Sequence, residues 1–236
     1  MPTVRALGAL LCVAAATALS GCATGTAEPP AGVNLAGNWK LDPAASDDPQ
    51  KVLAQMRAEA YKIINRGPQP AAPPLPRSGQ PSPRSTPQDQ TVYEDPLYST
   101  AGPGGQRIDP LRHSPMAHIL MTSIERGEFL TVRQGPEEFV LDYGSSQRSF
   151  TPGGHSVVSA EGGVGDQTSG WKGHEYVIEI KAQLGPTVTE TFGLSSDGKH
   201  LVDKLHISSG ELSTVNLTRV YDPTTEVAPR HMPNND

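Results

Sequence analysis

The chain has little cysteine and few aromatic residues. Among its 236 residues there are two cysteines, Cys12 and Cys22, and aromatic residues make up 5%. Both cysteines lie near the N-terminus, so the rest of the chain has no thiol for a disulfide, a CxxC redox motif or a thiolate metal site. Stability must therefore come from a packed core.

Motifs for catalysis and for nucleotide binding are also lacking. The glycine cluster at 162–165 does not end in the GK[ST] of a phosphate-binding loop, and there is no G-x-S-x-G nucleophile motif. His200 and His206 would be about 20 Å apart along a strand, too far to share one ion. The net charge of −6 argues against nucleic acid as a partner. We expect no catalytic residues, no metal site, no dissociable cofactor and no enzyme activity.

The N-terminus has the pattern of a targeting segment. Arg5 is its only charged residue, and positions 6–18 form an almost unbroken apolar run. The run is too short to span a membrane and has the length of a signal-peptide core. It ends in Leu19-Ser20-Gly21-Cys22. We expect residues 1–21 to be a signal peptide.

The tetrapeptide that ends at Cys22 resembles the lipobox of bacterial lipoproteins. The resemblance implies that the chain is cleaved before Cys22, which then carries diacylglycerol and an N-acyl chain as a membrane anchor. In that family the next residue guides sorting, and Ala23 in place of aspartate favours the outer membrane, facing the periplasm, over the inner membrane.

The next part of the chain is divided by composition. We expect a tether at 22–34, a strand at 35–41 and an accessory helix at 47–66, where Leu53, Met56 and Ala60 recur at helical spacing. Residues 67–107 are rich in proline and glycine, with eight prolines in 67–90, and predict a disordered linker. Residues 223–236 form a polar tail.

The main domain is expected at 108–222 and is read as a series of short strands. A short helix begins at Ser114-Pro115 and ends at Arg126-Gly127, although a strand at His118 to Ile124 is the competing interpretation. The predicted strands cover 129–133, 138–143, 147–151, 156–159, 174–182, 187–195, 200–208 and 213–221. The glycine-rich stretch 161–170 is expected to be flexible.

The last four strands alternate apolar and polar residues with period two, as strands with one buried face do. Their connections, among them Asp197-Gly198, are too short for crossover helices, so neighbouring strands are antiparallel. The fold class predicted is mainly β: an antiparallel barrel or strongly curved meander sheet, with one or two accessory helices. A two-sheet sandwich is the alternative.

Two charged residues, Glu190 and Arg219, fall on the apolar faces of these strands. A lone buried charge is unfavourable, so each is expected to have a partner. One interpretation is a structural ion pair, and the other is a pair of polar anchors for a ligand inside a barrel.

The strand at 35–41 contains Gly37-Asn38-Trp39, which resembles the G-x-W of the first lipocalin strand. In that family the tryptophan packs against an arginine near the end of the last strand, a place comparable to that of Arg219. Short motifs in the last half of the chain, such as Thr189-Glu190-Thr191, also resemble uncharacterised bacterial envelope proteins with a lipocalin-like domain. The resemblance implies fold and compartment but no activity.

Two functions follow from these observations. The first is a non-catalytic binding module whose barrel holds an apolar small molecule or lipid. The predicted ligand-binding residues are Trp39, Tyr176, Glu190, Phe192, Leu217 and Arg219. The second is an envelope interaction protein whose packed domain binds another protein or the cell wall. A cavity lined by the apolar members of this set favours the first, and a solid core with an exposed apolar patch favours the second.

Overall fold

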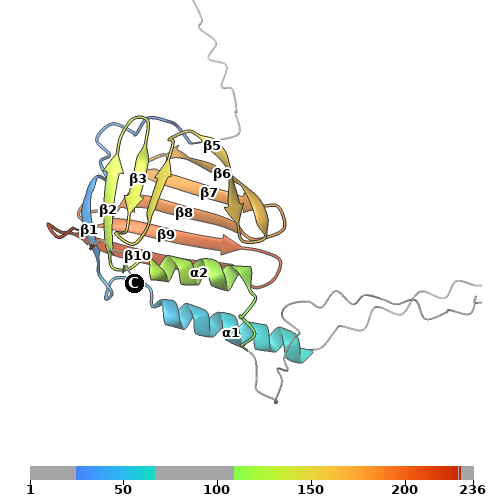
Figure 1. Ribbon diagram of the computed structural model, residues 1–236. Helices are drawn as coiled ribbons and strands as arrows, with labels where there is room; N and C mark the ends of the chain where they lie inside the picture. Colours follow the sequence, from blue (N-terminus) through green and yellow to red (C-terminus); the bar gives the residue numbers. More distant parts are fainter. Residues whose placement is uncertain (1–24, 67–108, 228, 230–236) are drawn as a thin grey trace, which may run out of the picture.

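The computed structural model describes residues 25–66, 109–227 and 229, which form a curved antiparallel sheet and two helices (Figure 1). The predicted signal peptide, the lipidation site Cys22 and the linker at 67–107 lie outside the described residues, as does most of the tail. The fold class predicted from the sequence, a mainly β chain with a strongly curved meander sheet, is confirmed.

The sheet has ten strands in the order β4-β3-β2-β1-β10-β9-β8-β7-β6-β5, and every pairing is antiparallel. Their bounds are β1 Gly37–Leu41, β2 Phe129–Gln134, β3 Phe139–Asp142, β4 Gln147–Phe150, β5 His155–Ala160, β6 Gly163–Lys172, β7 Glu175–Ala182, β8 Thr187–Leu194, β9 Leu201–Ser208 and β10 Val215–Pro223. Strand β1 lies between β2 and β10 and so joins two meanders into one sheet. This single sheet excludes the sandwich alternative.

The sheet curls without closing through hydrogen bonds. Its two ends are β4 and β5, which are not paired with each other. In Figure 1 strands β2 to β4 fold over β6 to β9, so the two halves face each other across a shared interior. The structure therefore selects the open curved sheet over the closed barrel.

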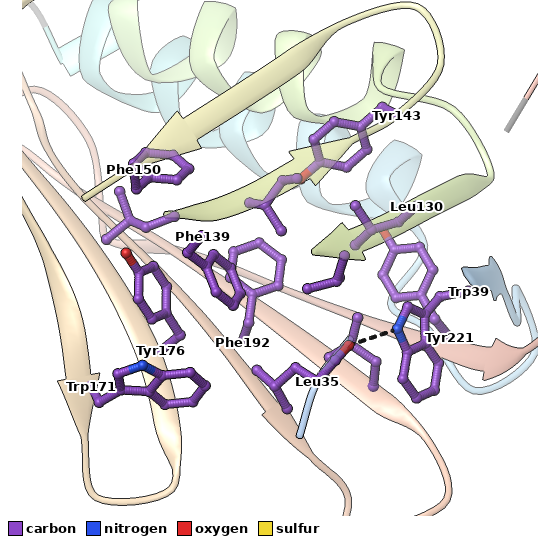
Figure 2. Packing of buried hydrophobic residues seen from close by; sticks show 14 residues of the cluster. Leu35, Trp39, Leu130, Phe139, Tyr143, Phe150, Trp171, Tyr176, Phe192 and Tyr221 are labelled. Carbon is purple, nitrogen blue, oxygen red and sulfur yellow. Dashed lines mark hydrogen bonds between the residues drawn. The ribbon is translucent and has the colours of Figure 1, made fainter. Parts of the chain in front are cut away.

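The aromatic core fills this interior (Figure 2). Phe139 of β3 stacks on Tyr176 of β7, with ring centroids 3.8 Å apart, and Trp171 of β6 meets both rings edge-on. Phe192 of β8 and Tyr221 of β10 are also completely buried. Packed aromatic rings dominate the energetics of such a core, and here they hold the curled halves together.

The two helices lie side by side at one end of the sheet (Figure 1). Helix α1 spans Pro49–Arg66, and helix α2 spans Pro115–Glu125 after the N-cap Ser114, whose hydroxyl accepts a hydrogen bond from the Ala117 N–H. A second hydrophobic cluster joins both helices to β9 and β10. It includes Leu53, Met56, Met116, Leu120, Leu205, Ile207 and Leu217. The helix at 114–126 is thereby confirmed over its competing strand interpretation.

The structure corrects the expectation for the glycine-rich stretch before β7. The glycine-rich stretch 161–170, expected to be flexible, lies mostly in β6, which pairs with β5 on one side and β7 on the other. Apolar alternation is weak in this strand because glycine stands where a side chain would be crowded. A Cβ on Gly165 would come within 3.2 Å of the Ile180 side chain. The strand is therefore specified by its two neighbours, a tertiary effect that periodicity does not register.

Part of the expected tether is attached to the sheet. Thr26 forms an antiparallel bridge with Trp171, with N···O distances of 2.8 and 2.9 Å in the two directions. Gly25 and Gly170 lie so close that a Cβ on either would be within 2.8 Å of the other's backbone. The chain is thus held near the end of β6, at the end of the sheet opposite the two helices (Figure 1).

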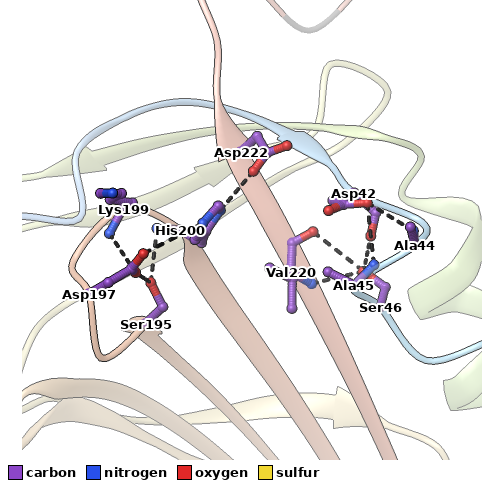
Figure 3. A network of polar contacts seen from close by, with 10 residues as sticks. All are labelled: Asp42, Ala44, Ala45, Ser46, Ser195, Asp197, Lys199, His200, Val220 and Asp222. Carbon is purple, nitrogen blue, oxygen red and sulfur yellow. Dashed lines mark hydrogen bonds and ion pairs between the residues drawn. The ribbon is translucent and has the colours of Figure 1, made fainter.

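Polar contacts fasten the edge where β1 leads into α1 (Figure 3). The Ser46 hydroxyl donates to the Asp42 carbonyl and accepts a hydrogen bond from the Val220 N–H. Nearby, His200 Nδ1 lies 2.7 Å from Asp222 Oδ1, which links the turn before β9 to β10. The Ser46 contacts hold the segment between β1 and α1 against β10.

Candidate functional site

A pocket of about 370 Å³ lies under α2, between the two edges of the sheet. Arg148 lines it from β4 and Ala160 from β5, so the pocket occupies the break between the unpaired edge strands. Its other lining residues come from α2 and its C-cap, from β5, from β7 to β9 and from the turns between strands: Ile119, Thr122, Arg126, Ser159, Glu161, Ile180, Pro186, Val188, Glu190 and Leu205. Six of the twelve lining side chains are apolar and four are charged, and pockets of this size that combine apolar walls with a few polar groups are typical of small-molecule sites.

Three charged side chains form what we call the Glu190 triad. Arg126, which caps α2, donates a hydrogen bond to Glu190 Oε1, and Arg148 of β4 donates to Oε2. The Glu190 side chain is 2% exposed, and those of Arg126 and Arg148 are 14% and 22% exposed. The triad therefore joins β8 to both α2 and the sheet edge at β4, and all three residues line the pocket.

The triad keeps Glu190 ionised. Burial alone would raise the pKa of the Glu190 carboxyl, but the charges and hydrogen bonds of Arg126 and Arg148 lower it to about 2. Burial would likewise lower the pKa of Arg126, and the charge of Glu190 instead raises it. Glu190 is thus negatively charged at neutral pH beside two guanidinium groups, and the triad has a net charge of +1.

Asp203 of β9 lies beside the triad and forms no ion pair with a described residue. It is 1% exposed, and neither of its carboxyl oxygens has a hydrogen-bond partner among the described residues. Burial, and then the charge of Glu190, raises the pKa of Asp203 to about 8. The hydroxyls of Tyr143 and Tyr221 are also buried and lack partners in the described part of the chain.

Arg219 has partners other than the expected ones. Its guanidinium donates to the carbonyls of Ser123 and Gly127, at 3.0 and 2.6 Å, and so holds the end of α2 against β10. It does not pair with Glu190. The Trp39 indole N–H donates to the Leu35 carbonyl, so the tryptophan and arginine of the lipocalin-like pattern have separate partners.

The six ligand-binding residues predicted from the sequence do not line one site in the structure. Glu190 is the one of the six that lines the 370 Å³ pocket. Trp39, Tyr176 and Phe192 are packed in the aromatic core. Leu217 and Arg219 line a smaller pocket of about 140 Å³ between α2 and β10.

Sequence reasoning missed Arg126, Arg148 and Asp203. From the sequence, Arg126 marks only the end of a helix. Asp203 lies on the same face of β9 as the buried Leu201 and Leu205. Arg148 lies on the same face of β4 as the buried Phe150. For both residues the sequence signal is a charged side chain on the buried face of a strand, which is the same signal that singled out Glu190.

The described residues contain no group of three His, Cys, Asp or Glu side chains that could hold a metal ion. Neither α1 nor α2 is long and apolar enough to cross a membrane.

Comparison with known proteins gives matches among solved structures alone. No protein-family model and no curated protein matches the chain. Lipid binding protein 8 of Caenorhabditis elegans matches with 10% identity and a TM-score of 0.42, over 82% of this chain and 100% of the other. The REP1-NXSQ fatty acid transporter matches with 10% identity and a TM-score of 0.38, over 81% and 97%. A fatty acid-binding protein from Drosophila melanogaster brain matches with 18% identity and a TM-score of 0.31, over 40% and 70%.

Proposed function

We propose that this protein is a membrane-anchored lipoprotein of the cell envelope whose β-domain binds a small apolar molecule or lipid without catalysing a reaction. The observation that carries the binding function is the pocket under α2, half of whose lining side chains are apolar and which is lined from both sheet edges. A ligand there would take the place of solvent against Ile119, Ile180 and Val188, and burial of apolar surface would drive its binding.

The anchoring half of the proposal rests on Leu19 to Cys22 and the apolar run before them. Cells that express the protein should incorporate a radiolabelled fatty acid into it, and Cys22→Ser should abolish that incorporation. Fractionation should place the labelled protein in the outer membrane. An unlabelled wild-type protein would overturn the anchoring proposal and leave the pocket unaffected.

The pocket is tested with an environment-sensitive apolar fluorophore added to the full chain carrying Cys22→Ser, a change that leaves every described residue in place. Val188→Trp would fill the pocket and should abolish the fluorescence gain. Val157→Trp is the matched control, because Val157 lies on the exposed β5 surface. Equal binding by both variants would contradict a site in this pocket.

The interaction protein stays the second candidate because of a separate observation. The aromatic core is solid, and Val157, Val164 and Leu184 are exposed near the β5–β6 and β7–β8 turns, Leu184 at 90%. Crosslinking in intact cells would test it. A specific protein adduct lost in Leu184→Asp, together with failure of the fluorophore experiment, would favour this function.

A further inference from the structure

We infer that the ligand of the pocket under α2 is an amphiphile with one anionic head group, which binds between Arg126 and Arg148. This inference rests on the proposed function, because it concerns the chemistry of the molecule that the pocket holds. It assigns the charged triad of the pocket to the head group and the apolar wall to the rest of the molecule.

The first step is the charge of the subsite. Arg126 and Arg148 face one carboxylate, Glu190, which leaves one positive charge in excess within the triad. The side chains are largely shielded from water, and an unbalanced charge is unfavourable in such a place. A ligand anion would remove the imbalance without displacing Glu190.

The second step is the supply of hydrogen-bond donors. A guanidinium has five N–H groups, and each arginine of the triad uses Nη1 to bind Glu190. The other N–H groups of Arg126 and Arg148 have no hydrogen bond to a described residue that would occupy them. Both residues line the pocket, so free donors are available at its surface for the paired oxygens of a carboxylate or phosphate.

The third step is the orientation of the two arginines. The Arg126 guanidinium lies over the Tyr143 ring at 5.4 Å, and that of Arg148 lies over the Phe150 ring at 5.0 Å. Both aromatic residues are buried. The guanidinium groups are therefore positioned before a ligand binds, which reduces the ordering cost of binding.

The charges around the triad also favour an anionic ligand. Arg219 is held by two backbone carbonyls, and Asp203 lacks a partner among the described residues. Adding these two to the triad gives three guanidinium groups against two carboxyl groups, so the cluster stays positive even with Asp203 ionised. The remaining carboxylate of the pocket, Glu161, is on the exposed turn after β5, where water screens it and His118 lies 3.8 Å away.

The fourth step is the apolar part of the ligand. Val188 and Glu190 follow each other on the same face of β8, so the wall changes from apolar to charged along the strand. Ile119 and Ile180 extend the apolar side. A small inorganic anion would leave these side chains without a contact, whereas an acyl or alkyl chain would cover them. Fatty carboxylates and lipid phosphate monoesters share this chemistry.

The first test uses the unaltered pocket. Binding of decanoate, decyl phosphate, decanol and decyltrimethylammonium to the full chain carrying Cys22→Ser is measured by displacement of the apolar fluorophore, at neutral pH and below micelle formation. We expect at least one of the two anions to bind about tenfold or more tightly than decanol, because charge-assisted hydrogen bonds supply that difference. Preference for the carboxylate or for the phosphate would distinguish the two sources of the anion.

The second test changes the subsite. Arg148→Gln should weaken binding of the preferred anion about tenfold more than it weakens binding of decanol. Arg133→Gln is the matched control, since Arg133 is an exposed β2 arginine that pairs with Asp142 outside the pocket. The decanol measurement also reports whether the Arg148→Gln pocket is intact.

The outcomes separate the two proposals. Equal binding of decanol and both anions, or a preference for the trimethylammonium probe, would overturn the anionic head group while the binding module stands. Binding of none of the four probes would overturn both. Anion preference that is lost in Arg148→Gln and kept in Arg133→Gln supports both.

Discussion

Glu190 on β8 and Asp203 on β9 are diagonal neighbours on the buried face of the sheet, because Glu190 pairs with Leu205 and Asp203 pairs with Phe192. The two carboxyl groups have opposite electrostatic environments. Two arginines bind Glu190 and lower its pKa to about 2, whereas burial and the nearby Glu190 charge raise the pKa of Asp203 to about 8. Their contrast yields two predictions with opposite pH dependence.

Asp203→Asn should stabilise the protein at pH 8. The pKa of Asp203 is about 8 in the folded chain, whereas its ordinary value, which we take for the unfolded chain, is 3.8. The folded state therefore holds a proton that the unfolded chain releases, and stability falls as pH rises from about 4 to 8, by roughly 1.4 kcal/mol per pH unit at most. Asparagine does not titrate, so the variant does not lose stability in this way as the pH rises. Urea unfolding from pH 4 to pH 8 measures it, with exposed Asp166→Asn as control. Parallel pH profiles for wild type and Asp203→Asn would contradict the prediction.

Glu190→Gln should destabilise the protein by about 3–5 kcal/mol, because Arg126 and Arg148 lose their shared counter-ion in a buried place. The carboxylate contributes stability above its ordinary pKa of 4.5, and this contribution is lost as pH falls toward 2. Thermal unfolding at neutral and acid pH should show a difference from wild type that shrinks in acid. The control Glu175→Gln removes an exposed pair with Lys204 and should change stability by less than about 1 kcal/mol. A neutral effect of Glu190→Gln would show that the triad is dispensable for folding.

Phe139→Ala should lower the free energy of unfolding by about 3–5 kcal/mol, the usual result of removing a large aromatic side chain from a core. Phe139 is fully buried and contacts rings from β6, β7 and β8. Phe129→Ala, at a half-buried β2 position, is the control and should have a smaller effect. Denaturant unfolding compares them, and equal losses would mean that the curled halves of the sheet do not depend on this contact.

Gly170→Ala should release the segment around Thr26 while the sheet stays folded. A Cβ at position 170 would lie 2.8 Å from the Gly25 carbonyl carbon and 3.0 Å from the Gly153 nitrogen. Amide hydrogen exchange at Thr26, whose N–H donates to the Trp171 carbonyl, should accelerate relative to that of β7 and β8. Gly210→Ala is the control, because a Cβ there would meet nothing within 4 Å. Unchanged protection of Thr26 would show that the backbone can shift to accommodate the methyl group.

The six predicted ligand-binding residues show why the alternation of apolar and polar residues does not by itself locate a pocket. Period-two alternation placed Tyr176, Phe192 and Glu190 on buried faces, and all three are buried. Alternation cannot say which buried residues meet another side chain and which meet a gap. Tyr176 and Phe192 face Phe139 across the curled sheet, whereas Glu190 faces the break between β4 and β5.

The sequence by itself determined the mainly β fold, the antiparallel order of the last four strands and the positions of both helices, because these depend on local periodicity, short turns and capping residues. The tertiary structure decided the rest. Strand β6 formed between two partners despite its glycines, and β1 joined two meanders through pairings distant in sequence. The Glu190 triad assembled from a helix end and two strands whose residues lie up to 64 positions apart. Such contacts depend on the curvature of the whole sheet, which no local pattern encodes.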